Sequence, residues 1–428
     1  MIRALKDFQN NALRTNIFVN YMSVIVELLT GLVTMTVINR ILGVDVYGII
    51  ITLLAFFSVI KAFITVNNQS AITKYISISI YKKNIEKYIS IFSYGMIVDL
   101  LSWGIFLVVV LIIKYLSSET AYSFGFSNQI FQIFLTGISF NILSASFIGI
   151  LHGHQKFKTT SLINITANLC KAIFICVFIS KGILYVALGY LLSDIVKFSF
   201  FLFLGLKIFL KNKGKFLFNP LYFKEYFEFI KFNFFSLSIK SIISKSDIIL
   251  LNYFTNSYTV GQFETIKKLF IPLNFIAPSI SSALFPKFSK YSVKNEITEL
   301  KRVIYKGTKF ITPISLAYII IISLFSEYYS NLQNIKIDFL VFITLSFYFF
   351  LNSSMWWGSI YFQNFDVKFP LFTNLTLLIS TLILVPITLH FIENKVLAIA
   401  IGTLISYIPS FTLGIFHLIK KLNYEKNT

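Results

Sequence analysis

Apolar runs of about twenty residues recur along almost the whole chain of 428 residues. A helix needs about 20 mostly apolar residues to cross the ~30 Å hydrocarbon core of a bilayer. The chain is 56% hydrophobic and 13% charged, with a mean hydropathy of +0.76, which excludes an ordinary soluble domain. The runs are continuous rather than alternating, so they predict helices and not the strands of a barrel. We expect an all-α integral membrane protein with twelve transmembrane helices, at 16–37, 47–66, 90–114, 129–150, 162–179, 183–206, 229–253, 266–286, 307–325, 338–358, 369–391 and 396–418.

Lysine and arginine residues are sorted by side along this pattern. With the amino terminus taken as cytoplasmic, the inner loops and termini hold 24 of them, against four on the outer side. This excess on the inner side predicts cytoplasmic termini, and it explains the net charge of +20 without a nucleic-acid partner. Residues 1–15 lack the apolar core of a cleavable targeting peptide.

The two halves of the chain share a repeated pattern. Asn39 lies nine residues before Gly48, and Asn252 lies nine residues before Gly261, 213 residues further on. A repeat of six spans begins and ends on the same side, so the halves form two parallel six-helix lobes. The same offset also relates Lys74 to Lys287 and Glu86 to Glu299.

The expected lobes are residues 1–206 and 229–428, which face each other across a central cleft. The longest polar interruption, 207–228, serves as a basic cytoplasmic linker between them. The other long inner loops are expected at 67–89 and 287–306, in corresponding places of the two lobes.

No catalytic or cofactor signature is present. The pair Gly214-Lys215 lacks the earlier glycine and the following hydroxyl residue of a phosphate-binding loop. His152 and His154 have no acids or thiols nearby, which indicates loop residues rather than a metal site. The two cysteines, Cys170 and Cys176, share one span and behave as small apolar residues. We therefore predict a protein that is not an enzyme and needs no cofactor or metal, with transport coupled to H⁺ or Na⁺, to the membrane potential or to the substrate gradient.

The first span carries a polar stripe at helical spacing. A carboxylate near mid-membrane costs at least ~2.5 kcal/mol against lipid, so Glu27 should face protein or a wet cavity. Packing against a neighbouring helix is the alternative, but a stripe along the whole span favours cavity lining and makes Glu27 a coupling or gating candidate. The stripe consists of Asn16, Asn20, Ser23, Glu27, Thr30 and Thr34.

The seventh span is the most polar. Lys240 lies near its centre and shares one face with Asp247, while Lys245 lies nearly opposite. Each of these charges either pairs with another span or lines the lumen. Lys240, Lys245 and the deep Lys171 of the fifth span are substrate-binding candidates, and Asp247 and Asp99 are coupling or gating candidates.

Further polar side chains complete the expected lumen. In the eighth span, Lys267 shares a face with Asn274, although it lies near the outer end. Lys61 lies close enough to an interface to reach water. Asp194 and Lys197, three residues apart in the sixth span, are expected to pair. With Lys61, Lys267 and Asn274 added as binding candidates, both lobes contribute positive residues and predict a cationic lumen.

Several motifs resemble a known family. Arg40-Ile-Leu-Gly43-Val-Asp-Val-Tyr-Gly48 is similar to the stretch after the first span of Wzx-type polysaccharide-biosynthesis flippases, although Val44 replaces the usual proline. This family belongs to the superfamily of MATE-like multidrug, oligosaccharidyl-lipid and polysaccharide exporters. Further similar stretches lie at Gly149–Phe157, Ser244–Asn252, Val260–Phe263 and Phe285–Lys290. The resemblance extends over the whole chain, although each motif alone is degenerate. In these motifs Arg40, Gly43, Gly48 and Gly261 identify the fold rather than a binding site.

The resemblance implies a flippase that moves an undecaprenyl-diphosphate-linked oligosaccharide to the outer leaflet of the bacterial cytoplasmic (inner) membrane, for O-antigen or capsule. It also implies a glycan polymerase and glycosyltransferases as partners. An ion-coupled multidrug exporter of the MATE type is the alternative, and it predicts a lumen dominated by acidic residues. A membrane scaffold without transport is the third possibility, and it leaves Glu27 and Lys240 without an aqueous role.

Overall fold

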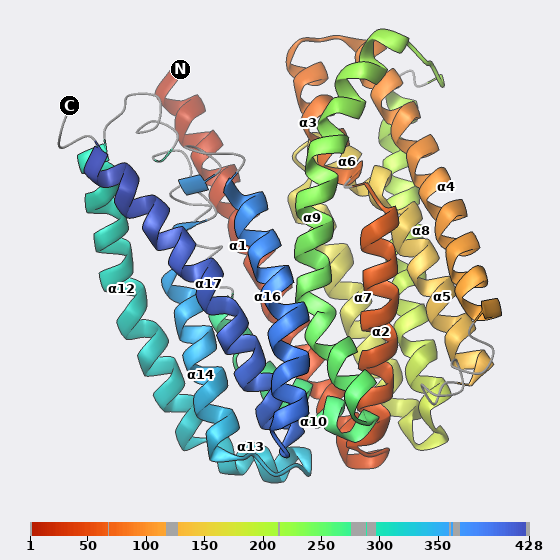
Figure 1. Ribbon diagram of the computed structural model, residues 1–428. Coiled ribbons are helices and arrows are strands. Elements are labelled where there is room, and N and C mark those ends of the chain that lie inside the picture. The colour runs from red at the N-terminus through yellow and green to blue at the C-terminus, as the bar shows by residue number, and fades with distance from the viewer. Residues whose placement is uncertain are drawn as a thin grey trace. The chain divides into compact units, whose positions relative to one another are not determined.

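The computed structural model describes residues 2–66, 68–116, 127–212, 215–274, 288, 297–358, 361–362 and 369–424 (Figure 1). Within these residues every regular element is a helix. The helices are α1 (Ile2–Ile41), α2 (Val44–Ile64), α3 (Asn68–Tyr81), α4 (Ile85–Leu116), α5 (Asn128–Leu143), α6 (Ala145–Gly153), α7 (Phe157–Phe178), the short 3₁₀ turn η2 (Ile179–Lys181), α8 (Ile183–Lys211), α9 (Pro220–Phe254), α10 (Ser257–Lys268), α12 (Ile297–Leu324), α13 (Ser326–Gln333), α14 (Phe339–Ser354), α16 (Phe369–Phe391) and α17 (Lys395–Tyr424).

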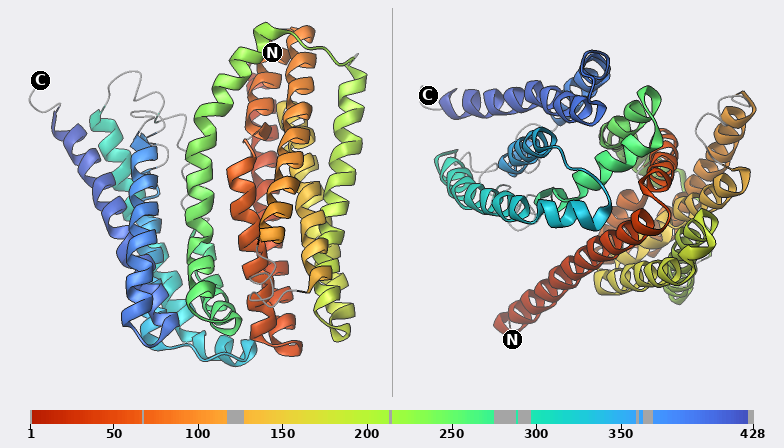
Figure 2. Two further views of the ribbon diagram at one scale, coloured as in Figure 1. Left: turned by 45° about the vertical axis from the view of Figure 1, so that its right-hand side comes forward. Right: turned by 90° about the horizontal axis from the view of Figure 1, so that it is seen from below.

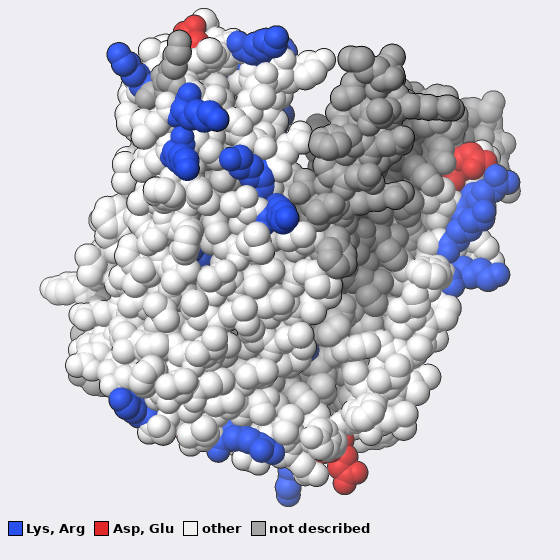
Figure 3. Space-filling view, turned by 180° about the vertical axis from the view of Figure 1, so that it is seen from behind, with Lys and Arg blue, Asp and Glu red and all other residues white. Residues whose placement is uncertain are grey.

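The helices confirm the expected all-α membrane fold. Among the described residues, nine helical segments are long and apolar enough to cross a membrane. The predicted seventh span corresponds to α9, which is 35 residues long but carries several charges, and the tenth to the apolar α14. Most of the predicted eighth span, 266–286, lies outside the described residues. On the part of the face in Figure 3 that is not grey, most Lys and Arg lie above or below a belt that is largely uncharged.

The chain divides into two compact units that exchange helix segments. Unit 1 comprises residues 1–42 and 56–238, and unit 2 comprises 43–55 and 239–428. Helix α2 therefore begins in unit 2 and ends in unit 1, and α9 begins in unit 1 and ends in unit 2. The compact units thus differ from the lobes that we predict at 1–206 and 229–428, because each unit takes part of one helix from the other half of the sequence.

The helix boundaries reproduce the repeat seen in the sequence. α1 ends at Ile41 and α2 begins at Val44, while α9 ends at Phe254 and α10 begins at Ser257, each 213 residues later. The first connection is tight because Gly43 has a positive φ of 99°, a conformation that glycine adopts without strain. The second connection uses Asn256, whose side chain caps α10 by accepting from Thr259 N at 3.0 Å.

Two glycines of the repeat meet inside unit 2. A Cβ atom on Gly48 would lie 1.8 Å from the carbonyl oxygen of Ser257, and one on Gly261 would lie 2.1 Å from that of Val44. The first turns of α2 and α10 therefore pack backbone against backbone. Nearby, Thr52 donates a hydrogen bond to Asn252 Oδ1 at 3.3 Å. These contacts give Gly48 and Gly261 the structural role that the motif predicts.

The prediction of an inner loop at 67–89 is wrong. Helix α3 occupies most of it, and α4 begins at Ile85. Ile72 and Ile76 of α3 are buried against glycines of α4 and α6, where the absence of side chains allows a close approach. The i, i+4 spacing of these two isoleucines is that of a helix face. The long apolar span just before them makes this short helix hard to recognise in the sequence. In the corresponding loop at 287–306, most of 287–296 lies outside the described residues and α12 begins at Ile297.

The basic linker is shorter than the predicted 207–228. Helix α8 continues to Lys211 and α9 begins at Pro220. The start of α9 is fastened to α4 by an ion pair of 2.5 Å between Lys87 and Glu225. Just before α9, Asn219 donates to Glu86 Oε1 at 2.6 Å. Charge patterning alone therefore overestimates the length of the connection, because both helices extend beyond the apolar core of the membrane.

Each unit has its own apolar core. In unit 1, α8 packs against α5 and α7, and α4 packs against α5 (Figure 2). The rings of Phe147 and Phe209 pack against Phe92 of α4, in the same apolar cluster as Ile72 and Ile76 of α3. In unit 2, Trp356 and Trp357 follow α14 and anchor a second cluster. A Cβ on Gly307 of α12 would lie 2.1 Å from the Trp356 ring, so α12 packs closely against this indole.

Candidate functional site

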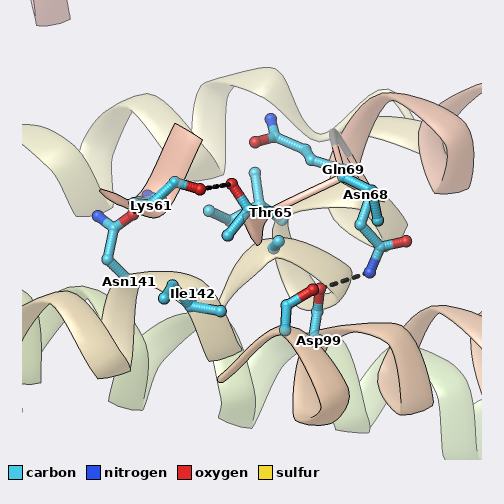
Figure 4. A pocket seen from close by; sticks show the side chains of 11 residues that line it. Lys61, Thr65, Asn68, Gln69, Asp99, Asn141 and Ile142 are labelled. Atoms are coloured by element: carbon cyan, nitrogen blue, oxygen red, sulfur yellow. Dashed lines mark hydrogen bonds between the residues drawn. The ribbon is translucent and has the colours of Figure 1, made fainter. Parts of the chain in front are cut away.

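Two interrupted helical paths of unit 1 enclose a polar cavity (Figure 4). The chain leaves α2 at Ile64 and enters α3 at Asn68, and Ser144 separates α5 from α6. Interrupted helices inside a membrane protein occur where the backbone lines a cavity or contacts other protein groups. The cavity has a volume of about 170 Å³. It is lined by Lys61, Thr65, Val66, Asn68, Gln69, Asp99, Ser102, Asn141, Ile142, Ala145 and Ile148.

Asp99 of α4 joins the two interruptions. It is only 4% exposed. Its Oδ1 accepts a hydrogen bond from Asn68 Nδ2, and its Oδ2 accepts from the backbone N of Ser146 at 2.7 Å and from the Ser146 hydroxyl. Tyr226 of α9 donates to the carbonyl oxygen of the Asn68 side chain. Because hydrogen bonds occupy both carboxylate oxygens, Asp99 holds the starts of α3 and α6 in place.

Lys61 of α2 lies on the opposite side of the cavity from Asp99, beside Asn141 (Figure 4). Its ammonium group donates to Asn141 Oδ1, and it lies within electrostatic range of Asp194 and Asp99. The sequence predicts Lys61 near an interface, but α3 extends the path to Tyr81, so Lys61 lies near the middle of the path. The structure thus places a lysine ammonium in the central part of unit 1.

Lys171 and Glu27 belong to the same electrostatic group. The Lys171 ammonium lies 4.9 Å from the ring centroid of Tyr190, and it is within electrostatic range of Glu27 and Asp194. Glu27 is exposed, although Ser23 and Thr30 on its face of α1 are buried. The Thr30 hydroxyl bonds to the backbone of α1 itself, so this part of the stripe packs and only Glu27 projects from it. The side chains of Asn16 and Asn20 lie outside the described residues.

The expected pairing of Asp194 with Lys197 is absent. In the part of the chain that the structure describes, no ion pair joins these side chains. Asp194 instead points toward Gly137 of α5, where a Cβ would lie 2.7 Å from Asp194 Oδ2. Its carboxylate is within electrostatic range of Lys197, Lys171 and Lys61. Helical spacing of three brings two side chains to one face, but it does not by itself bring their charged atoms into ion-pair contact.

In unit 2, an ion pair links α9 to α10. Lys267 Nζ donates to Asp247 Oδ2 and lies 3.8 Å from Glu264 Oε2. Asp247 and Glu264 are 6% and 8% exposed. The ion pair therefore neutralises Lys267 and leaves one excess negative charge in this group. It accounts for Lys267 and Asp247, predicted as a binding and a coupling residue, through a direct contact between them.

Asn274 belongs to a chain of hydrogen bonds across unit 2. It accepts from Asn352 Nδ2 of α14 at 2.9 Å. Asn352 Oδ1 in turn accepts from the Tyr407 hydroxyl of α17 at 3.3 Å. These amide and phenol groups thus connect the segment after α10 with α14 and α17 inside the apolar region.

Lys240 and Lys245 of α9 make no ion pair or hydrogen bond within the described residues. Lys240 is exposed and Lys245 is half-buried. Lys240 precedes Asp247 by two helical turns and shares its face, which farther along is the buried face of α9.

His152 and His154 have hydrogen-bond partners in unit 1. The ring of His152 contacts the Gln69 amide at 3.4 Å and the Thr160 hydroxyl at 3.2 Å. His154 Nε2 lies 3.0 Å from the Tyr88 hydroxyl. Burial lowers the pKa of His154, and the nearby charge of Lys156 lowers it further, so the ring is neutral at pH 7. Among the described residues, no group of three His, Cys, Asp or Glu side chains could hold a metal ion.

Several residues of the cavity escape prediction from the sequence. Asn68 and Gln69 fall in the predicted inner loop, and Asn141 lies inside the fourth predicted span. Asn141 could have been identified from the sequence, because a side-chain amide inside an apolar run must find a hydrogen-bond partner. Ser146, Tyr226 and their shared bonds with Asn68 and Asp99 depend on contacts between distant helices, which no local pattern encodes.

The fold is that of MATE transporters. The chain is 15% identical to a multidrug resistance MATE family transporter of the MOP superfamily in its inward-facing conformation, over 94% of this chain and 96% of that one, with a TM-score of 0.76. It is 16% identical to a MATE crystallised in complex with MaD3S, over 97% and 96% of the two chains, with a TM-score of 0.67. These similarities show the twelve-helix fold alone.

Sequence comparison supplies the family. No curated protein matches the chain. The profile of a family described as polysaccharide biosynthesis protein matches residues 13–292, about two thirds of the chain. This match covers all of unit 1 from the first span onward and reaches the α10 region of unit 2. The chain is a member of the polysaccharide biosynthesis protein family, with a multi-pass MATE-like membrane fold.

Proposed function

We propose that this protein is a flippase that moves an undecaprenyl-diphosphate-linked oligosaccharide from the inner to the outer leaflet. One observation carries the proposal beyond family membership. Lys240 and Lys245 lie in a membrane helix and make no ion pair within the described residues, although a charged side chain in the membrane is costly without a partner. An anionic substrate would supply that partner during transport.

The chemistry of the diphosphate matches these lysines. A diphosphate diester carries about two negative charges, and ammonium groups compensate for the water that it loses in the membrane. Lysine offers a mobile point charge rather than the fixed fork of arginine, which suits a ligand that must be released. We assign the first contact to Lys240, which is exposed. Lys245, on the nearly opposite side of α9, would make a separate contact, and Lys61 and Lys171 are the corresponding cations of unit 1.

Transport by alternating access follows from the two parallel repeats. The polyprenyl tail stays in lipid while the oligosaccharide passes through the protein. Coupling to H⁺ or Na⁺ would involve Glu27, whose side chain is exposed near Lys171. Asp99 and Asp247 are less suited to this role, because hydrogen bonds or an ion pair already occupy their carboxylates. The membrane potential would assist the outward movement of two negative charges by up to about 4.6 kcal/mol per 100 mV.

An ion-coupled multidrug exporter of the MATE type is the second candidate. Its supporting observation is the group of acids in unit 1, where Glu27 and Asp194 make no ion pair within the described residues. A cationic drug would bind these carboxylates, whereas the lipid-linked substrate would bind the lysines. Charge removal at Lys240 therefore distinguishes the two functions, because only the lipid-linked substrate would bind there, whereas Glu27 would have a role in both.

We place the protein in the bacterial cytoplasmic membrane with both termini in the cytoplasm, in keeping with the charge distribution. In this setting, glycosyltransferases supply the substrate on the inner side. A glycan polymerase or ligase consumes it on the outer side, to form O-antigen, capsule or another surface glycan.

The test uses purified protein in vesicles that contain a fluorescently labelled, diphosphate-linked oligosaccharide lipid. We expect Lys240→Gln to slow flipping at least tenfold and Lys240→Arg to retain part of the rate, because only the arginine keeps the charge. Lys82→Gln, which removes an exposed lysine from the turn after α3, is the matched control and should flip normally. A correctly folded Lys240→Gln protein that flips at the wild-type rate would make Lys240 structural and contradict the proposal.

A further inference from the structure

Unit 2 carries a second polar recess, separate from the charged residues described above. It lies between α10 and the α13 region and has a volume of about 580 Å³, within the range of small-ligand sites. It is lined by Tyr258, Gln262, Ser330, Asn331, Asn334, Ile335 and Lys336. We call these seven residues the α10–α13 groove.

Apart from Lys336, the side chains of the groove are uncharged and suit a hydroxyl-rich ligand. Amide groups offer both donors and acceptors, which match the hydroxyls and acetamido groups of a sugar. Tyr258 adds an apolar ring face and a phenolic hydroxyl, and a sugar ring likewise has a face of C–H bonds with polar groups at its edge. The lining contains no carboxylate, so nothing in it selects for a cation.

Hydrogen bonds fix the shape of the groove but leave the amides of Asn331 and Asn334 and the Gln262 oxygen available. Gln262 Nε2 donates to the carbonyl oxygen of Lys336 at 2.8 Å, which ties α10 to the segment after α13. The Ser330 hydroxyl donates to the carbonyl oxygen of Ile335, and Asn334 ends α13 with a positive φ of 54°. The side chains of Asn331 and Asn334 are exposed and make no hydrogen bond within the described residues. A preformed site with free polar groups loses little entropy on binding.

The position of the groove relates it to the substrate path. In unit 2, α13 lies at the end opposite to the carboxyl terminus (Figure 1). With a cytoplasmic carboxyl terminus, the groove opens on the outer side of the membrane, where the oligosaccharide emerges. This step rests on the proposed function and orientation.

We infer that the α10–α13 groove is a carbohydrate-binding site that holds neutral or N-acetylated sugar residues of the glycan on the outer side. Tyr258 contacts the face of a sugar ring, and Gln262, Asn331 and Asn334 bond to its hydroxyl or acetamido groups. Such a site retains the emerging head group while the diphosphate leaves the lysines of the membrane region.

The experiment measures binding of soluble sugars to the full protein in lipid nanodiscs by saturation-transfer NMR. The probes are maltotriose and tri-N-acetylchitotriose, which have neither lipid nor diphosphate, so binding does not depend on flipping. We expect millimolar binding of at least one probe, and at least a tenfold loss in Tyr258→Ala and in Asn331→Ala. Tyr328→Ala removes an exposed tyrosine of α13 outside the groove and should bind as the wild type does.

The outcomes separate this inference from the proposed function. Wild-type protein that flips the labelled lipid but binds neither sugar overturns the groove and leaves the flippase intact. Sugar binding that survives both groove substitutions also overturns it, because Tyr258 is then only an aromatic anchor at the membrane surface. Sugar binding through the groove without any flipping supports the site and contradicts the flippase proposal.

Discussion

At the scale of single residues, what distinguishes the charges is whether a partner is present. Asp99 and Asp247 are buried, and protein groups occupy their carboxylates. Lys267 is held by Asp247, whereas Lys240 has no such partner within the described residues. The position of these residues within the predicted spans makes all of them equal candidates for lining the lumen. The contacts divide them into residues that hold helices together and residues that remain available to a substrate.

The ion pair between Asp247 and Lys267 should stabilise unit 2. Lys267→Gln leaves Asp247 and Glu264 buried without a cation, so we expect a loss of about 3–5 kcal/mol. The double variant Asp247→Asn/Lys267→Gln should recover a large part of it, because the uncompensated charge is gone. Thermal unfolding of the purified proteins in detergent measures both effects. Purely additive losses in the double variant would show that the pair contributes no coupling energy.

Glu27 offers the test of an ionic role in unit 1. Glu27→Gln keeps the size and hydrogen bonding of the side chain but removes its charge. We expect normal abundance of the protein and reduced export of surface glycan in cells, because Lys171 loses a counter-charge. Glu393→Gln, in an exposed loop, is the control. Unchanged export at equal abundance would show that the charge of Glu27 has no role in transport.

At the scale of helices, interruptions and close backbone contacts determine where polar groups lie. The α2–α3 break and the α5–α6 break both face the cavity, and Asp99 bridges them. Apolar periodicity predicts the spans in which these breaks occur. It treats α5 and α6 as a single helix, and it treats α2 and α3 as a span followed by a loop. Interruption depends on which residues supply hydrogen bonds across the gap, and these residues are distant in sequence.

The contact between the first turns of α2 and α10 leads to a prediction at this scale. Gly48→Ala places a methyl group against the backbone of Ser257, which cannot move aside, so we expect a destabilisation of about 1–3 kcal/mol or more. Gly104→Ala in α4 is the control, because a Cβ there meets nothing within 4 Å. The helix preference for alanine should leave Gly104→Ala as stable as the wild type. The apparent melting temperatures of the two variants compare them directly, and equal values would contradict the close contact.

At the scale of the whole molecule, topology is the property most directly open to experiment. The loop at Lys215 should be cytoplasmic and the turn at Asn256 should be outside, because the excess of lysine and arginine fixes orientation. A reporter that is active only outside the cytoplasm should work when fused at Asn256 and stay inactive at Lys215. Activity at Lys215 would overturn both the orientation and the parallel repeat.

The sequence by itself determined the class of fold. Its apolar runs, charge asymmetry and 213-residue repeat predict a helical membrane protein of two parallel halves, because helix length and loop charge are local properties. The motif glycines were also accessible from the sequence, since the repeat alone marks Gly48 and Gly261 as equivalent positions.

Only the tertiary structure decided which polar groups are satisfied. It paired Lys267 with Asp247, directed Asp194 toward Gly137, placed Lys61 in the middle of the α2–α3 path and joined Asn68 to Asp99. It also exchanged parts of α2 and α9 between the compact units. These features depend on contacts between helices far apart in the chain. Spacing along one helix fixes only the face on which a side chain lies, and packing fixes what it meets there.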